Sequence, residues 1–192
     1  MRSVKKILTD SINTKLRLVS DKEVTEAIED VVDLCIIALR NGNSIYWCGN
    51  GGSAADAQHL AAELSGRFYF DRDPLPSDAL HCNTSYLTAV GNDYGYDKVY
   101  SRLIKGLGKK GDVLIGLSTS GKSINIINAF SEANNMGMVT IGMTGKSGGE
   151  FNDICGRTIK VPSSDTPRIQ ECHITIGHII CEQIENSLFD EA

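Results

Sequence analysis

Four side chains with metal-binding chemistry stand in two helix-forming stretches of the sequence. In DAQHLAAEL, His59 and Glu63 are four residues apart, so on a helix they share one face. In RIQECHITIGHIICE, Gln170 and His178 offer an amide oxygen and a second imidazole. Together they form a nitrogen and oxygen ligand set suited to zinc or a similar divalent ion. Taken alone, the His–Glu pair is more typical of a solvated helix face than of a metal site, and a lone helical histidine is usually structural.

The spacing of Gln170 and His178 complicates a site that uses both. Eight residues of regular helix separate two positions by about 12 Å along the helix axis. We therefore expect either that Gln170 lies before or at the frayed start of its helix, or that the ligands come from two protomers.

A second group of candidates lies in Gly116–Ser123, which reads GLSTSGKS. The hydroxyls stand around an expected helix N-terminus, where free N–H groups and the helix dipole favour a phosphate; they belong to Ser118, Thr119, Ser120 and Ser123. The same letters satisfy the pattern of a nucleoside triphosphate-binding P-loop. Such an enzyme also needs an aspartate at the end of another strand to hold magnesium, and none follows the other expected strands. A sugar phosphate is therefore the favoured ligand; a nucleoside triphosphate and a serine-rich helix cap without a ligand are the alternatives.

A third loop, GNGGS at 49–53, follows another expected strand. Gly51 and Gly52 permit a close approach of the backbone to a ligand. Asn50 and Ser53 can contact sugar hydroxyls. Glycine turns are common, so this loop by itself is weak evidence for a site.

Strands alternate with helices along most of the chain. The first forty residues read as two helices, the second opened by a capping box of Ser20 and Glu23. The pattern then predicts strands at 44–49, 77–82, 112–118, 138–143 and 157–162, and helices at 54–65, 84–90, 98–104, 124–134 and 166–188, with GNDYGYD as a loop. The expected fold is a single α/β domain, 1–192: a five-stranded parallel sheet flanked by helices on both faces, a flavodoxin-like three-layer sandwich. Ligands of such sheets bind at the carboxyl ends of the strands.

Composition narrows the possible partners and locations. The net charge is −5 and the isoelectric point about 5.4, so no basic field is available to hold a nucleic acid. No apolar run approaches the roughly 18 residues that span a bilayer. The N-terminus is typical of an amphipathic helix rather than a signal peptide. The six cysteines form no CxxC pair and stand mostly in apolar runs, which favours a cytoplasmic location.

Four motifs occur in a fixed order: CGNGGSAADAQHLAAEL, GNDYGYD, LSTSGKSINI and RIQECHITIGHIICE. Over nearly the whole chain they resemble the phosphoheptose isomerases of the sugar isomerase (SIS) domain group. The resemblance implies conversion of D-sedoheptulose 7-phosphate to D-glycero-D-manno-heptose 7-phosphate through an enediol, the first step of bacterial heptose biosynthesis for lipopolysaccharide or capsule. It also implies one Zn²⁺ per subunit and a homotetramer with active sites between subunits, in which residues 1–41 serve oligomerisation.

Carried over by position, the resemblance implies the zinc ligands His59, Glu63, Gln170 and His178. The implied substrate contacts are Asn50, Gly51, Gly52, Ser53, Glu63, Asn92, Asp93, Ser118, Thr119, Ser120, Ser123 and Gln170. An aldose–ketose isomerase needs a base near the reacting carbons and an acid near their oxygens, and Glu63 and His178 are the candidates. Pro167 departs from the family, because some members have an acidic residue there. The same group contains adaptors and sugar-phosphate sensors that lack the catalytic set, whereas this chain retains it.

Overall fold

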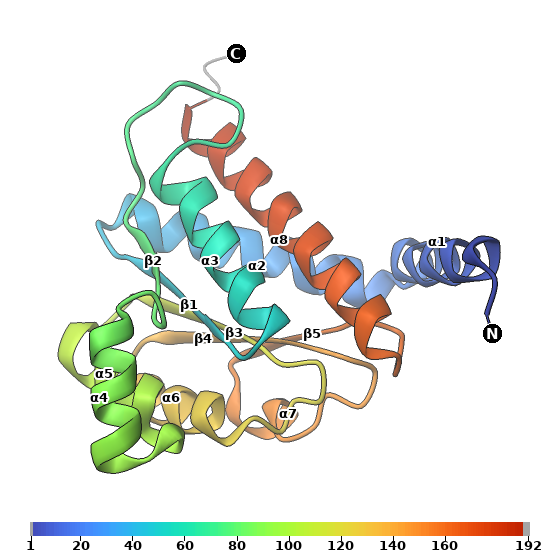
Figure 1. The fold of residues 1–192 in the computed structure, drawn as a ribbon. Helices are drawn as coiled ribbons and strands as arrows, with labels where there is room; N and C mark the ends of the chain where they lie inside the picture. Colours follow the sequence, from blue (N-terminus) through green and yellow to red (C-terminus); the bar gives the residue numbers. More distant parts are fainter. Residues whose placement is uncertain (1, 190–192) are drawn as a thin grey trace.

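The computed structural model describes residues 2–189, so residues 1 and 190–192 of the expected 1–192 domain lie outside the described part. Five strands form one parallel sheet in the order β2-β1-β3-β4-β5 (Figure 1). Their bounds are β1 Ile45–Gly49, β2 Ser77–Ala79, β3 Val113–Leu117, β4 Val139–Thr144 and β5 Arg157–Lys160. The parallel five-stranded sheet expected from the alternating pattern is confirmed.

Helices cover both faces of this sheet (Figure 1). One face carries α2 (Lys22–Arg40), α3 (Gly52–Ser65) and α8 (Thr166–Phe189). The opposite face carries α4 (Thr84–Tyr94), α5 (Val99–Leu107), α6 (Ile124–Asn135) and α7 (Phe151–Ile154), with a 3₁₀ turn at Tyr96–Lys98. Each face has its own buried apolar cluster, because alternate strand residues point to opposite sides. Trp47 and Leu60 belong to the first cluster, Tyr100 and Phe130 to the second.

The strand order reverses between β1 and β3, since the chain leaves β1 toward one face and β3 toward the other. In open α/β sheets, ligands bind outside the carboxyl ends of the strands at such a switch point. The two loops that meet here are GNGGS after β1 and STSGKS after β3. Asn50 and Asn125 join them through two reciprocal amide hydrogen bonds of 2.9 and 2.8 Å.

Several expected boundaries are wrong in detail. Ser20 does not cap the second helix: it is the last residue of α1 (Val4–Ser20), and its hydroxyl donates to the Leu16 carbonyl. Asp21 is the cap instead, because its carboxylate accepts the Val24 N–H. The expected strand 77–82 ends at Ala79. Helix α4 continues through Asn92 and Asp93, where a loop was expected, and α7 was not anticipated.

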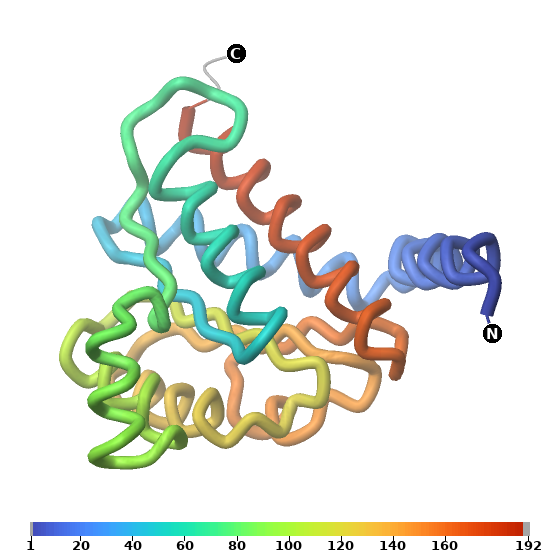
Figure 2. Tube along the Cα trace, in the orientation of Figure 1, coloured from blue at the N-terminus to red at the C-terminus, as the bar shows by residue number. Residues whose placement is uncertain are grey.

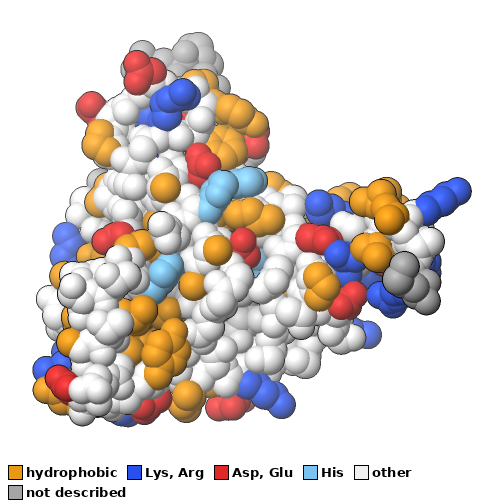
Figure 3. Space-filling model, viewed as in Figure 1, with side chains coloured by type: hydrophobic (Ala, Val, Ile, Leu, Met, Phe, Trp, Pro, Cys, Tyr) orange, Lys and Arg blue, Asp and Glu red, His pale blue; other side chains and the backbone are white. Residues whose placement is uncertain are grey.

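Helix α1 projects from the rest of the molecule (Figure 2). Four large apolar side chains follow one another at helical spacing on it and are exposed: Leu8, Ile12, Leu16 and Val19. Figure 3 shows apolar side chains gathered on this arm. The inner side is attached to α8, where the Ser11 hydroxyl donates to the Glu171 carboxylate at 2.7 Å. The outer side is thus an apolar stripe without an intramolecular partner among residues 2–189.

The six cysteines are free thiols, and four of them are buried, as the apolar runs indicated. Within residues 2–189, none of the helices combines the length and hydropathy needed to cross a membrane.

Candidate functional site

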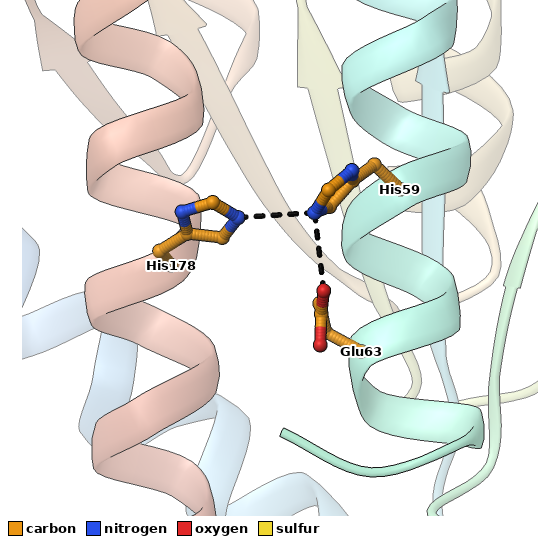
Figure 4. Close-up of side chains that lie close together, drawn as sticks. All are labelled: His59, Glu63 and His178. Atoms are coloured by element: carbon orange, nitrogen blue, oxygen red, sulfur yellow. Dashed lines mark hydrogen bonds and ion pairs between the residues drawn. The ribbon is translucent and has the colours of Figure 1, made fainter. Parts of the chain in front are cut away.

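Three donor atoms converge between α3 and α8 (Figure 4). His59 and Glu63 extend from α3, and His178 extends from α8 to meet them. The two histidine Nε2 atoms lie 3.1 Å apart, and His59 Nε2 lies 3.1 Å from Glu63 Oε1. We call these three side chains the trio. Figure 3 shows histidine side chains at the surface over α3 and α8, so the trio is open to solvent on one side.

The trio fits a divalent cation by donor type and by spacing. All three donor atoms lie within 4.8 Å of one another. Two nitrogens each about 2.1 Å from one tetrahedral ion would stand about 3.4 Å apart, close to the observed 3.1 Å. Two imidazoles and one carboxylate match a catalytic zinc site, in which three protein ligands leave one position open.

Gln170 does not join the trio. Helix α8 begins at Thr166, so Gln170 lies in its second turn, and the expectation that it precedes the helix or marks a frayed start is wrong. Its side chain lies against Gly52 at the start of α3, where a Cβ atom would stand 2.8 Å from the Gln170 amide nitrogen. Gln170 and His178 therefore remain about 12 Å apart along the helix. The alternative, that two protomers supply the ligands, stays open.

The two helices that carry the trio hold two further titratable residues whose pKa is shifted. Asp56, one turn before His59 on α3, has a buried carboxylate oxygen without a hydrogen-bond partner in the described residues. Burial raises the pKa of Asp56 above its ordinary value, although His59 and His178 oppose the rise. His173 belongs to α8 and is fully buried, and burial lowers its pKa to about 4. It is therefore neutral near pH 7 and stands outside the trio.

The serine-rich loop forms a cluster of hydroxyls at the start of α6. Ser118 is 5% exposed, and its Oγ lies 2.9 Å from that of Ser123 and 3.4 Å from that of Ser120. Gly121 has φ +64°, so the loop turns through the left-handed region that glycine tolerates. Thr119 and Ser120 line a cavity of about 270 Å³. Ser123 makes no side-chain cap to α6, which leaves its hydroxyl for the cluster.

The GNGGS loop lies beside this cluster. Gly51 precedes α3 with φ +56° and ψ −122°, a conformation in which a side chain would be strained. Asn50 is already bonded to Asn125 and accepts the Tyr96 hydroxyl at 3.3 Å. Ser53 is buried in the first turn of α3. Gly51 and Gly52 are exposed, so backbone is accessible at this carboxyl edge of the sheet.

Asn92 and Asp93 stand on the last turn of α4 and are exposed. The Asn92 amide donates to the Asp93 carboxylate at 2.9 Å. The described residues show no polar contact between this pair and the trio or the serine cluster. Pro167 occupies the first turn of α8, where a missing N–H is harmless.

The sequence did not reveal the residues that contact the backbone or the rings of the trio from neighbouring segments. Phe68 packs on His178 with ring centroids 5.8 Å apart. Arg72 donates to the Glu63 carbonyl at 3.0 Å and pairs with Glu185 of α8 at 2.7 Å. An arginine in a loop and a glutamate on a helix are ordinary in any sequence, so only their side-chain burial, 2% and 0% exposed, distinguishes them.

Comparison with known proteins matches residues 9–145 to the family model described as "SIS domain". A phosphoheptose isomerase of Burkholderia pseudomallei (strain 1710b) is 52% identical over 172 residues, which cover 90% of this chain and 87% of that protein. The solved structure of a phosphoheptose isomerase from Francisella tularensis superposes with a TM-score of 0.91 at 34% identity, covering 97% of this chain and all of that one. That from Neisseria gonorrhoeae gives 0.89 at 40% identity, covering 95% and 97%.

Proposed function

The chain belongs to the SIS domain family and, within it, to the phosphoheptose isomerases, and from that premise we propose that it converts D-sedoheptulose 7-phosphate to D-glycero-D-manno-heptose 7-phosphate. The observation that carries the proposal is the convergence of His59, Glu63 and His178 across α3 and α8. A fold alone would also suit a sensor or an adaptor. A candidate base, a candidate acid and a set of metal-ligand types gathered in one place favour catalysis.

The substrate has its phosphate at C7 and reacts at C1 and C2, so its two ends need separate sites. The serine cluster of Ser118, Thr119, Ser120 and Ser123 suits the phosphate, because hydroxyls and free backbone N–H groups meet at the start of α6. The trio suits the other end. His59 follows Gly52 by seven residues on α3, which places it about 10 Å further along the helix axis. We propose that the sugar contacts the exposed backbone of Gly51 and Gly52. The proposed side-chain contacts are Asn50, Ser53, Asn92, Asp93 and Gln170.

The proton transfers give Glu63 the role of base at the carbons and His178 the role of acid at the oxygens. Glu63 removes a proton from C1 of the ketose while His178 donates one to the C2 oxygen, which gives the enediol. His178 then takes the proton of the C1 hydroxyl as Glu63 returns its proton to C2, which gives the aldose. Both residues end in the protonation state in which they began. The proton that Glu63 carries from C1 to C2 is the only carbon-bound hydrogen that can exchange with solvent during the reaction.

We propose Zn²⁺ as the cofactor, one per subunit, held by His59, Glu63 and His178 with Gln170 as the fourth ligand. A divalent ion at this position supplies Lewis acidity toward the sugar oxygens. A carboxylate that binds a metal is a weaker base, and an imidazole nitrogen that binds a metal carries no proton. The metal-binding and proton-transfer roles of Glu63 and of His178 therefore compete. Because Gln170 lies against Gly52 of its own chain, its participation requires a second protomer or a movement of its side chain.

The proposal extends to the assembly and its setting. We propose a cytoplasmic homotetramer in which the residues 1–41 helical pair forms subunit contacts, supported by the exposed apolar stripe of α1. Its product would enter the heptose of lipopolysaccharide or capsule.

Proton NMR of the protein with sedoheptulose 7-phosphate in D2O, with chelator and then with added zinc, tests the reaction. We expect aldose signals with deuterium at C2, lost with chelator and restored by zinc. The Glu63→Gln variant should bind substrate and lose most turnover, because an amide cannot take the C1 proton. Near-normal turnover of that variant would remove Glu63 from the base role, and no conversion in any metal state would contradict the assigned substrate.

A further inference from the structure

One buried carboxylate holds the loop that joins α3 to β2. Figure 2 shows this loop, residues 66–76, arching beside the end of α8. Glu185 of α8 accepts the backbone N–H groups of Phe68, Tyr69 and Phe70 and the Nε–H of Arg72. Both charged side chains are almost completely buried. A buried ion pair persists only when further hydrogen bonds satisfy its partners, and four donors surround this carboxylate.

Arg72 extends the same network to the end of α3. Its guanidinium donates to the carbonyls of Glu63 and Leu64 at 3.0 Å, of Gly66 at 3.3 Å and of Asp73 at 2.9 Å. The last carbonyls of a helix lack intrahelical partners, and a cation near them is favourable. Arg72 therefore caps α3 at the turn that carries Glu63.

The loop also contacts the trio at its α8 member, His178. Phe68, whose N–H is held by Glu185 at 2.9 Å, packs its ring on His178. Glu185 itself stands seven residues after His178, two turns along the same helix. The ion pair thus ties the helix that carries His59 and Glu63 to the helix that carries His178, without touching any donor atom of the trio.

We propose that Glu185 and Arg72 are positioning residues that set the separation of α3 and α8 at the trio, and so determine its affinity for a divalent cation. The inference rests on the proposed function, because it assumes that the trio binds a metal. A purely structural ion pair would stabilise the fold and leave the metal affinity of the folded protein unchanged. A positioning pair changes that affinity even where the fold survives.

Cobalt(II), which absorbs visible light when bound by nitrogen and oxygen ligands, is a direct probe. Glu185→Gln keeps the size of the side chain and replaces one acceptor oxygen by an amide that faces N–H donors. Arg72→Lys keeps the charge and loses the planar fork that reaches several carbonyls. The matched control is Asp30→Asn, which removes an exposed ion pair to Arg157 whose atoms are 3.3 Å apart. Metal-free samples of each full-length protein are titrated with CoCl2, and circular dichroism verifies the fold.

We expect wild-type protein and the Asp30→Asn control to bind cobalt alike. Glu185→Gln and Arg72→Lys should bind it about 10- to 100-fold more weakly, as is typical when residues behind metal ligands are changed, and with altered absorption. Folded variants that retain wild-type affinity and spectrum overturn the positioning role while leaving the proposed function intact. Failure of the wild type to bind cobalt overturns metal binding by the trio, and this inference with it. If Glu185→Gln does not fold, the milder Arg72→Lys decides between the outcomes.

Discussion

Helices α3 and α8 pack tightly where Gly177 faces Leu60, and we predict that alanine at Gly177 impairs the site more than the fold. A Cβ atom at Gly177 would stand 2.3 Å and 2.5 Å from the two Cδ atoms of Leu60. Carbon atoms in van der Waals contact are about 3.5–4.0 Å apart, so more than 1 Å must be recovered by movement. Leu60 is fully buried, so its side chain has little room to yield.

Two opposing terms determine the stability of Gly177→Ala. Replacing glycine by alanine inside a helix stabilises it by up to about 1 kcal/mol. Overpacking a buried contact costs about 1–3 kcal/mol, so the net effect is a loss of up to about 2 kcal/mol. The effect on activity is larger, because Gly177 precedes His178 and a shift of about 1 Å at a catalytic group can cost about 100-fold in rate. We therefore expect turnover to fall roughly 100-fold in a protein that still folds.

Urea denaturation at one fixed protein concentration and steady-state turnover measure the two effects. Gly106→Ala on α5 is the control, because no atom lies within 4 Å of a Cβ placed there. It should raise stability slightly and leave turnover unchanged. A second variant, Leu60→Ala combined with Gly177→Ala, should lose less stability than the sum of the single changes, since it removes the clashing methyl groups. A Gly177→Ala protein that matches wild type in turnover and gains stability as Gly106→Ala does would refute the close-packing argument.

Three other predictions follow from separate parts of the structure. Ser118→Ala removes a hydroxyl from the serine cluster and should raise KM about 10- to 100-fold, the value of a hydrogen bond to a charged group, with little change in kcat; an unchanged KM would place the phosphate elsewhere. Ile12→Glu introduces a charge into the exposed stripe of α1 and should give a smaller assembly by light scattering, with unchanged circular dichroism; an unchanged mass would contradict the role of α1 in oligomerisation. Burial acts to raise the pKa of Glu185, but the N–H donors of Phe68, Tyr69 and Phe70 and the Arg72 side chain bring it below the ordinary 4.5. Its contribution to stability should therefore be complete above about pH 4.5 and decline as the pH falls through the lower folded-state pKa; a Glu185→Gln protein with the same acid dependence as wild type would contradict this.

Most of the fold was readable from local patterns. Strand and helix periodicities differ, and parallel strands joined by helices require covering layers on both faces. Apart from the short helix α7, which was not anticipated, the errors lay at the ends of elements, where single hydrogen bonds decide. Asp21 rather than Ser20 caps α2, and α4 extends over Asn92 and Asp93 until Gly95, with φ +91°, ends it.

Spacing along the chain is enough to identify the groups whose geometry is local. His59 and Glu63 share a face because helical spacing puts them there, and the hydroxyls of GLSTSGKS gather because one short loop carries them. Which of these groups meet distant partners depends on how the helices pack. Packing at Gly177 brings His178 to His59 across 119 residues of chain, while the regular helix keeps Gln170 beside Gly52. The Arg72–Glu185 pair joins residues 113 positions apart in the sequence. It forms only because folding buries both side chains and fixes the separation of α3 and α8, and neither burial nor that separation can be read from spacing along the chain.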